Sequence, residues 1–321
     1  MPSRRKLIAA ALIAAGAAIG AAEFAAAQEK ITLAIGQRGF WDSMVVPYGA
    51  EAGIFKKYGL EVNIVWTRGG AETLQAALSG SADYALTNGT VGVLAAYAKG
   101  APVRIVSSQS RGAGDIFWYV KADSAIKTLK DAEGKTMGFS RPGSSSHAIG
   151  LALAKQFGVN PKLLPSGGPA ETRTQVMSGQ IDLGWGVPPM MLDLVKSGQA
   201  RIVVRGDALT ALNAVSVRVN VTTKDFLAKR PKVAEAFIRA YAESIDWMYA
   251  NPAKSLEWFA RDNKVSIEIA KEALAFYPKE RMVPFPISGL DHEIAEAVEH
   301  KHLAKPLTPE QIKELVVGPM Q

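Results

Sequence analysis

From Glu29 onward, the pattern of apolar and polar positions alternates between two periods. Short apolar runs predict strands, and the stretches between them, in which apolar residues recur every three or four positions, predict helices that end at Gly59, Gly80 and Gly100. The strands predicted in the first half span residues 31–35, 61–66, 81–87 and 103–107. Strands that alternate with helices in this way are typical of an α/β protein with a largely parallel sheet.

The second half of the sequence repeats the first. Three pairs of identical residues share one offset of 99 positions: Ala71 and Ala170, Gly80 and Gly179, Asp83 and Asp182. The two aspartates stand where a helix stops and a strand starts, so we expect them to have a structural role. The period is far too long for a solenoid repeat. It therefore predicts two similar α/β lobes.

Two further strand-like segments connect these lobes. Residues 115–120 lie between the repeated units, and residues 214–221, which alternate between apolar and polar, follow the second unit. Two extended segments that cross between lobes form a hinge. The remaining sequence is mostly helical in pattern, and we assign it to the first lobe. The predicted organisation is a first lobe made of residues 28–112 and 207–321, and a second lobe made of residues 113–206.

The first 27 residues have the pattern of a cleaved export signal. Arg4, Arg5 and Lys6 precede an alanine-rich apolar run, and an Ala-x-Ala cleavage site ends at residue 27. We therefore expect a periplasmic protein, and the general secretory and twin-arginine routes both stay open. The sequence has no cysteine. This excludes a disulfide, a thiolate metal site, a cysteine nucleophile and a lipid-anchor cysteine.

Charge and motifs narrow the function classes. The formal net charge is +7, and it falls to about +5 without the signal. The basic residues are scattered, which argues against nucleic-acid binding, while the mildly positive field favours anionic ligands. His300 and His302 do not have the spacing of a defined metal site. Since the sequence also has no nucleophile elbow or phosphate loop, we expect no metal, no cofactor and no catalytic residues.

Ligands of open α/β sheets bind beyond the carboxyl ends of the strands, against helix amino termini. Three loops fall at that edge in each lobe, and together they offer glycine pairs, hydroxyls, cations and aromatic rings. The candidate ligand-binding residues of the first lobe are Gln37, Arg38, Phe40, Trp41, Gly69, Gly70, Asn88, Gly89 and Thr90. Those of the second lobe are Arg141, Ser144, Ser145, Ser146, Gly168, Pro169, Trp185, Gly186 and Val187. This set suits a small organic anion with an apolar body.

The three serines precede an apolar, helix-periodic run and are typical N-cap residues. The unpaired N–H groups and the dipole of such a helix attract an anion, and Arg141 adds a guanidinium suited to a bidentate grip. We expect this group to hold the anionic head of the ligand, with Trp41 or Trp185 stacked on its body. The alternatives are an ordinary capped helix with solvated arginines, and tryptophans that belong to the core.

Three stretches resemble the periplasmic solute-binding proteins of nitrate/sulfonate/taurine-type ABC importers. They are GIFKKYGLEV at 53–62, GGAETLQAALSGSAD at 69–83 and SRPGSSSH at 140–147. The resemblance covers essentially the whole mature chain. It implies a two-lobed periplasmic-binding-protein fold of type II, in which hinged lobes close on a small molecule and present it to a membrane permease with its ATPase. By position, the ligand loops of the family fall on residues 37–42, 69–70, 88–90, 140–146, 168–169 and 185–187.

The resemblance does not name the ligand, because family members bind sulfonates, nitrate, taurine, aromatic carboxylates or thiamine-pyrimidine precursors. We expect an aromatic carboxylate or a sulfonate-like anion, and a monomeric protein. A sensor that hands its ligand to a membrane receptor is an open alternative. Relatives that build the thiamine pyrimidine, and a deaminase with the same fold, depend on cysteine, which disfavours an enzyme here.

Overall fold

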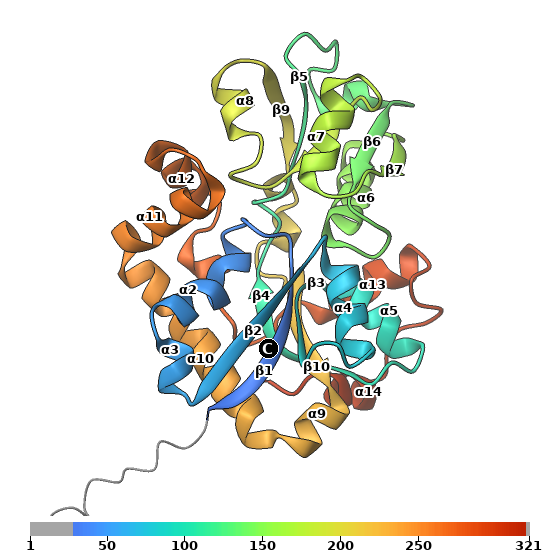
Figure 1. Ribbon diagram of the computed structural model, residues 1–321. Coiled ribbons are helices and arrows are strands. Elements are labelled where there is room, and N and C mark those ends of the chain that lie inside the picture. The colour runs from blue at the N-terminus through green and yellow to red at the C-terminus, as the bar shows by residue number, and fades with distance from the viewer. Residues whose placement is uncertain (1–27, 319–321) are drawn as a thin grey trace, which may run out of the picture.

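The structure is a computed structural model that describes residues 28–318, so the predicted export signal lies outside the described residues. Two α/β lobes stand one above the other (Figure 1). The larger lobe, at the bottom of the view, contains a five-stranded sheet in the order β2-β1-β3-β10-β4. Its strands are β1 (Glu29–Gly36), β2 (Leu60–Thr67), β3 (Tyr84–Gly89), β4 (Val103–Ser110) and β10 (Arg218–Thr223). Strands β1, β2 and β3 are parallel, whereas β10 runs antiparallel to both of its neighbours.

The smaller lobe repeats this arrangement. Its strands are β5 (Phe117–Lys121), β6 (Thr136–Phe139), β7 (Lys162–Pro165), β8 (Gly184–Gly186) and β9 (Ala200–Arg205). Strands β6 and β7 are parallel, β5 lies antiparallel between β8 and β9, and a parallel bridge from Met137 to Leu183 joins the two groups. The resulting order, β7-β6-β8-β5-β9, matches that of the larger sheet. The two similar lobes predicted from the sequence repeat are therefore confirmed.

The larger sheet is completed by a strand that follows the smaller lobe in the sequence, whereas the smaller sheet is built from one continuous segment. Strand β5 follows β4 directly but lies in the smaller lobe, and β10 follows β9 but lies between β3 and β4. The two connections between lobes are the segments 111–116 and 206–217, which precede these strands. The predicted pair of connections is thus present, although β5 and β10 themselves belong to sheets and are not free hinge strands. We propose the lobe boundaries at residues 112/113 and 206/207, within these connections.

The repeated aspartates have equivalent structural roles. A carboxylate oxygen of Asp83 accepts a hydrogen bond of 2.7 Å from the backbone N–H of Thr32, at the start of β1. In the smaller lobe, a carboxylate oxygen of Asp182 accepts one of 2.8 Å from the backbone N–H of Thr136, at the start of β6. Asp83 thus ties the chain before β3 to β1, and Asp182 ties the chain before β8 to β6. The structural role predicted for both aspartates is confirmed.

Helices cover both faces of the larger sheet (Figure 1). On one face, Tyr48, Phe55 and Phe237 join the core through α2 (Val45–Glu51), α3 (Ile54–Lys57) and α10 (Pro231–Ala250). On the other face, the core includes residues of α4 (Gly70–Leu78), α5 (Thr90–Ala98), α13 (Leu290–Glu299) and α14 (Pro309–Leu315). The smaller lobe carries α6 (Ser145–Phe157), α7 (Pro169–Met177) and α8 (Leu192–Lys196).

The other helices belong to the helical C-terminal segment. They are α9 (Lys224–Lys229), α11 (Pro252–Asn263) and α12 (Ile267–Leu274). Short 3₁₀ helices also occur along the described part of the chain, at Asp42–Met44, Leu129–Ala132, Gly206–Ala208, Thr210–Leu212 and Lys279–Arg281. Helix α12 contacts α8 of the smaller lobe.

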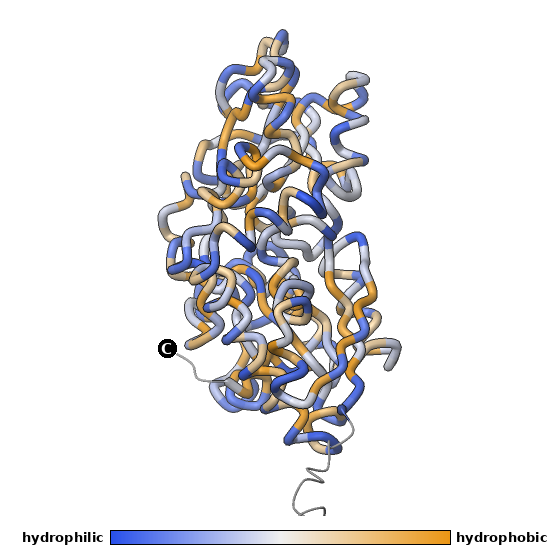
Figure 2. Tube along the Cα trace, turned by 60° about the vertical axis from the view of Figure 1, so that its left-hand side comes forward, coloured by the Kyte–Doolittle hydropathy of each residue, from blue (hydrophilic) through white to orange (hydrophobic). Residues whose placement is uncertain are grey.

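In both lobes, orange apolar stretches are short and are interrupted by polar ones (Figure 2). Among residues 28–318, none of the helices combines the length and the apolar character that a membrane crossing requires.

Candidate ligand-binding cleft

A cavity lies between the lobes, where the carboxyl ends of β1 and β3 face the amino terminus of α6. The larger lobe and the connections supply Gly36, Gln37, Phe40, Asp42, Gly69, Gly70, Thr87, Gly89, Ile116 and Arg218, and the smaller lobe supplies Ser140, Ser144, Ser145, Ser146 and Trp185. The volume open to solvent is about 40 Å³, room for roughly three water molecules at ~10–15 Å³ each. A larger ligand therefore requires the lobes to move apart.

Glycines allow the two lobes to approach this closely. A Cβ atom at Gly89 would lie 2.7 Å from the backbone nitrogen of Ser145 in the other lobe. One at Gly92, in α5, would lie 2.6 Å from the carbonyl oxygen of Gly143. Real side chains do not approach backbone atoms so closely. The structure is thus a closed arrangement of the lobes that these glycines permit.

The amino terminus of α6 forms one wall of the cavity. The Ser144 hydroxyl oxygen caps the helix by accepting a hydrogen bond from the backbone N–H of His147 at 3.3 Å. The Ser146 hydroxyl oxygen accepts one from the backbone N–H of Ser140 at 3.0 Å. The N–H groups of Ser145 and Ser146 belong to the first turn and have no acceptor within the helix. This wall therefore offers backbone donors and the positive end of a helix dipole.

The two candidate arginines lie outside the cavity. The guanidinium of Arg141 is 2.7 Å from the carboxylate of Glu72 on α4, across the mouth of the cleft. Glu72 also pairs with Arg68, at 2.8 Å. Arg38 is exposed and stacks over the ring of Trp66, 5.7 Å from its centroid. Neither guanidinium lines the cavity in this closed arrangement.

The two candidate tryptophans have different positions. Trp41 is fully buried, packs edge-on against Phe259 at 5.2 Å between ring centroids, and donates its indole N–H to the Tyr249 hydroxyl at 3.1 Å. The expectation that Trp41 stacks on a ligand is therefore corrected: helices α10 and α11 enclose its ring. Trp185 lines the cavity, and its indole N–H is anchored on the carbonyl oxygen of Gly167 at 3.1 Å.

Several other candidates are occupied by structural contacts. The Asn88 amide accepts from the Thr73 hydroxyl and donates to the carbonyl oxygen of Ala85, both at 2.8 Å. Thr90 is buried and donates its hydroxyl to a backbone carbonyl. Val187 belongs to the core, and Gly186 lies against the ring of Phe117. In this closed arrangement these four residues make framework contacts and do not line the cavity, whereas Gly89 lies at its wall.

The remaining candidates face one another across the cleft. Gln37 and Phe40 of the loop after β1 line the cavity with Gly69 and Gly70. Gly168 and Pro169 open α7 in the smaller lobe. A Cβ atom at Gly168 would lie 3.3 Å from the side-chain oxygen of Gln37, so this loop meets the amino terminus of α7.

A buried charged network at the base of the cavity was not predicted. Arg218, on β10, donates hydrogen bonds to Asp115 and to the Ser110 hydroxyl, and its Nε lies 3.5 Å from Oδ2 of Asp42. Although burial works in the opposite direction, Asp115 and Asp42 raise the pKa of the Arg218 guanidinium, which keeps it charged. The sequence did contain one signal for this network, because Arg218 lies between the apolar positions of the strand predicted at residues 214–221.

Asp42 begins the short 3₁₀ helix after Trp41 and is only 2% exposed. Burial raises the pKa of its carboxyl group; Arg218 opposes this shift and Asp115 adds to it. Among the described residues, neither of its carboxylate oxygens accepts a hydrogen bond. Asp42 lies at the end of the predicted loop 37–42, but an acidic residue did not fit the expected anion and was not selected.

Backbone strain is present at the same wall. Thr87, the β-branched residue before Asn88, has φ of +64°, in the left-handed region that such residues rarely adopt. Its hydroxyl oxygen accepts a hydrogen bond of 2.9 Å from the backbone N–H of Gly36. A strained residue held in this way is a recurring feature of ligand sites.

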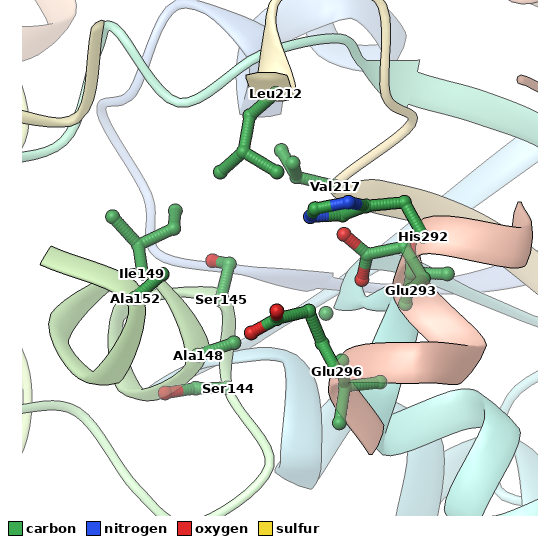
Figure 3. A pocket seen from close by; sticks show the side chains of 13 residues that line it. Ser144, Ser145, Ala148, Ile149, Ala152, Leu212, Val217, His292, Glu293 and Glu296 are labelled. Atoms are coloured by element: carbon green, nitrogen blue, oxygen red, sulfur yellow. The ribbon is translucent and has the colours of Figure 1, made fainter. Parts of the chain in front are cut away.

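A second, smaller cavity of about 20 Å³ lies on the other side of the α6 amino terminus (Figure 3). Ile149 and Leu212 form apolar walls, and His292, Glu293 and Glu296 of α13 point into it. Burial raises the pKa of the Glu293 carboxyl group to about 8. Since this volume holds at most about one or two water molecules, the cavity is a contact region between α13 and α6.

Comparisons with known proteins agree with this architecture. The model of the NMT1/THI5-like family matches residues 42–255. The 4-amino-5-hydroxymethyl-2-methylpyrimidine phosphate synthase THI13 of Saccharomyces cerevisiae is 25% identical over 216 residues, which make up 63% of this chain and 62% of the yeast protein.

Two solved structures share the fold. The periplasmic aliphatic sulphonate binding protein SsuA of Escherichia coli has a TM-score of 0.70 and 20% identity, covering 91% of this chain and 93% of SsuA. The periplasmic nitrate-binding protein NrtA of Synechocystis PCC 6803 has a TM-score of 0.72 and 16% identity, covering 90% and 86%. The fold is thus the two-lobed periplasmic-binding-protein fold. Because the family model spans about two thirds of the sequence, the chain belongs to the NMT1/THI5-like family.

Proposed function

We propose that this protein is the extracytoplasmic substrate-binding component of an ABC importer. It captures a small organic anion, an aromatic carboxylate or a sulfonate-like molecule, between its lobes and delivers it to a membrane permease. The observation that carries the proposal is the cavity between the lobes, whose wall is the amino terminus of α6 with the Ser145 and Ser146 N–H groups. Sulfonate and nitrate binding by SsuA and NrtA, which share the fold, support the same ligand class.

The mechanism follows from contacts that exist only when the lobes meet. A ligand bound to one lobe gains the donors of the other lobe on closure, and this difference in affinity drives the closed state. Three ion pairs join the lobes and add to closure: Arg141 with Glu72 at 2.7 Å, Lys155 with Glu299 at 2.6 Å, and Lys196 with Glu272 at 2.8 Å. All three pairs are partly or largely exposed and are screened by solvent, so the ligand decides the equilibrium.

A binding role is favoured over catalysis by the composition of the cavity. The residues that line it include no histidine, cysteine or lysine, and Asp42 and Arg218 are its titratable groups. The yeast relative is named as a synthase, but enzymes of that architecture depend on cysteine, which this sequence lacks. We further propose export to the periplasm and function as a monomer, with nitrate, taurine or a thiamine-pyrimidine precursor as alternative ligands.

A thermal-melt screen of the chain from Gln28 onward tests this function. The panel contains aromatic carboxylates, alkyl and aryl sulfonates, nitrate, taurine and pyrimidines. A ligand at about a hundred times its dissociation constant adds roughly 2.7 kcal/mol to the stability of the native state, which raises the melting temperature of a protein of this size by several degrees. A shift confined to one chemical class supports the proposal. The absence of any shift across the panel contradicts it.

A permease test separates import from sensing. If a permease and an ATPase are encoded beside this gene, vesicles that contain them should take up the screened ligand only when the protein is added. Uptake that does not depend on the protein, combined with ligand-dependent binding to a membrane receptor, would instead establish the sensor alternative.

A further inference from the structure

We propose that the ligand carries an N–H donor, an amino or ammonium group, in addition to its anionic end, and that Asp42 is the residue that selects for it. This inference rests on the proposed function and deepens it. It follows from the chemistry of the cavity base, opposite the α6 amino terminus.

The first observation is an unsatisfied carboxylate. Asp42 lines the cavity, is 2% exposed, and accepts no hydrogen bond at either carboxylate oxygen from the described residues. A buried polar group without a partner is costly, and native proteins rarely leave one unpaired. Because Asp42 lines the cavity, a donor on the ligand would supply the missing hydrogen bonds.

The second observation is that the nearest cation is already engaged. Arg218 directs its hydrogen bonds to Asp115 and to the Ser110 hydroxyl, and its Nε stays 3.5 Å from Oδ2 of Asp42. Two buried carboxylates therefore share one guanidinium. The base of the cavity thus favours a positive or hydrogen-bond-donating group.

The two ends of the cavity favour ligand groups of opposite charge. The first-turn N–H groups at Ser145 and Ser146 favour an anion, whereas Asp42 disfavours one. A purely anionic molecule, such as nitrate or an alkylsulfonate, would leave the Asp42 oxygens unpaired and place a second negative charge beside them. An anion that also bears an amino group satisfies both ends. Specificity then comes from the cost of leaving a buried polar group unpaired when the amino group is missing.

Matched ligand pairs test the inference in the unmodified protein. The pairs are taurine with ethanesulfonate, 4-aminobenzoate with benzoate, and 4-aminopyrimidine-5-carboxylate with pyrimidine-5-carboxylate, measured by titration calorimetry. In whichever pair binds, we expect the amino-bearing compound to bind at least about tenfold more tightly than its partner without the amino group. This is the usual effect of a hydrogen bond to a charged group. Equal affinity within the pair, or binding of only members that lack the amino group, would overturn the inference.

The Asp42→Asn variant assigns the preference to this residue. It keeps the shape of the side chain but removes the charge, so the amino preference should fall to within about twofold. The control is Glu293→Gln, a change to another buried carboxyl group, in the second cavity (Figure 3), which should keep the preference. A preference that persists in Asp42→Asn would assign amino recognition elsewhere. If circular dichroism shows that Asp42→Asn does not fold, the matched ligand pairs in the unmodified protein still test the inference.

The outcomes separate the two proposals. If anions without an N–H group bind at least as tightly as their amino-bearing counterparts, the binding function stands and the role of Asp42 is wrong. If no compound of the pairs or of the wider panel binds, the binding function itself is wrong.

Discussion

Arg141 of the smaller lobe and Glu72 of the larger lobe form an ion pair of 2.7 Å across the mouth of the cleft. Arg141 was expected to hold the anionic head of the ligand. In the closed arrangement its partner is instead a carboxylate of the opposite lobe, and both side chains are roughly one third exposed. The pair therefore acts on closure, from outside the cavity.

A double-mutant cycle on this pair distinguishes a closing contact from a ligand contact. We expect Arg141→Ala and Glu72→Gln each to weaken binding of the best compound in the screen by less than about fivefold, because partly exposed ion pairs contribute about 1 kcal/mol or less. The double variant should lose no more binding affinity than either single variant. A loss above about a hundredfold in Arg141→Ala alone, measured by calorimetry, would show that Arg141 binds the ligand directly.

Gly92→Ala should prevent full closure. Its Cβ would lie 2.6 Å from the carbonyl oxygen of Gly143 in the other lobe, while alanine suits the helical position. Small-angle scattering should therefore give a larger radius of gyration for the ligand-saturated variant than for the unmodified protein. Affinity should fall by about tenfold or more, with an unchanged or higher melting temperature without ligand. Identical radii of gyration would mean that the loop containing Gly143 moves aside, so that the added Cβ does not prevent closure.

Trp41 and Trp185 should separate stability from binding. Trp41→Ala removes a fully buried ring and should lower the free energy of unfolding by about 3–5 kcal/mol in urea titrations. Trp185→Phe keeps an aromatic ring but removes the indole that lines the cavity. It should abolish the change in tryptophan fluorescence on ligand binding. A fluorescence change that survives in Trp185→Phe would point to another tryptophan near the ligand.

Glu293 should make stability depend on pH. Burial raises its pKa from 4.5 to about 8, and the adjacent Glu296 adds to the shift. The folded state therefore retains a proton that the unfolded state loses, so this contribution to stability is complete below about pH 4.5 and is lost as the pH rises toward 8. Glu293→Gln should remove a slope of at most about 1.4 kcal/mol per pH unit. Parallel urea midpoints for both proteins from pH 5 to pH 8.5 would contradict this.

The sequence was sufficient for the parts of the fold that depend on local pattern. The offset between Asp83 and Asp182 predicted the repeat, and both carboxylates fasten equivalent strands. Helix α10 follows from its proline start and apolar stripe. These features are short-range or periodic, so a single sequence contains them.

The site was harder to predict because it depends on tertiary contacts. Trp41 follows a strand as a ligand residue would, but the distant residues Tyr249 and Phe259 enclose its ring. Arg218 and Asp115 are about a hundred residues apart and meet only when β10 enters the first sheet. The serines at α6 were found because their capping signal is local.

The late position of β10 in the sequence has a consequence for the order of folding. All strands of the smaller sheet lie within residues 117–205, whereas the larger sheet lacks its fourth-ranked strand until residue 223 is available. As the chain is synthesised from its amino terminus, β3 can pair with β1, but β4 has no partner strand in the sheet until β10 is made and enters between β3 and β4. The sheet whose strands are made first is thus the one completed last, because the contacts of β10 join residues that are far apart in the sequence.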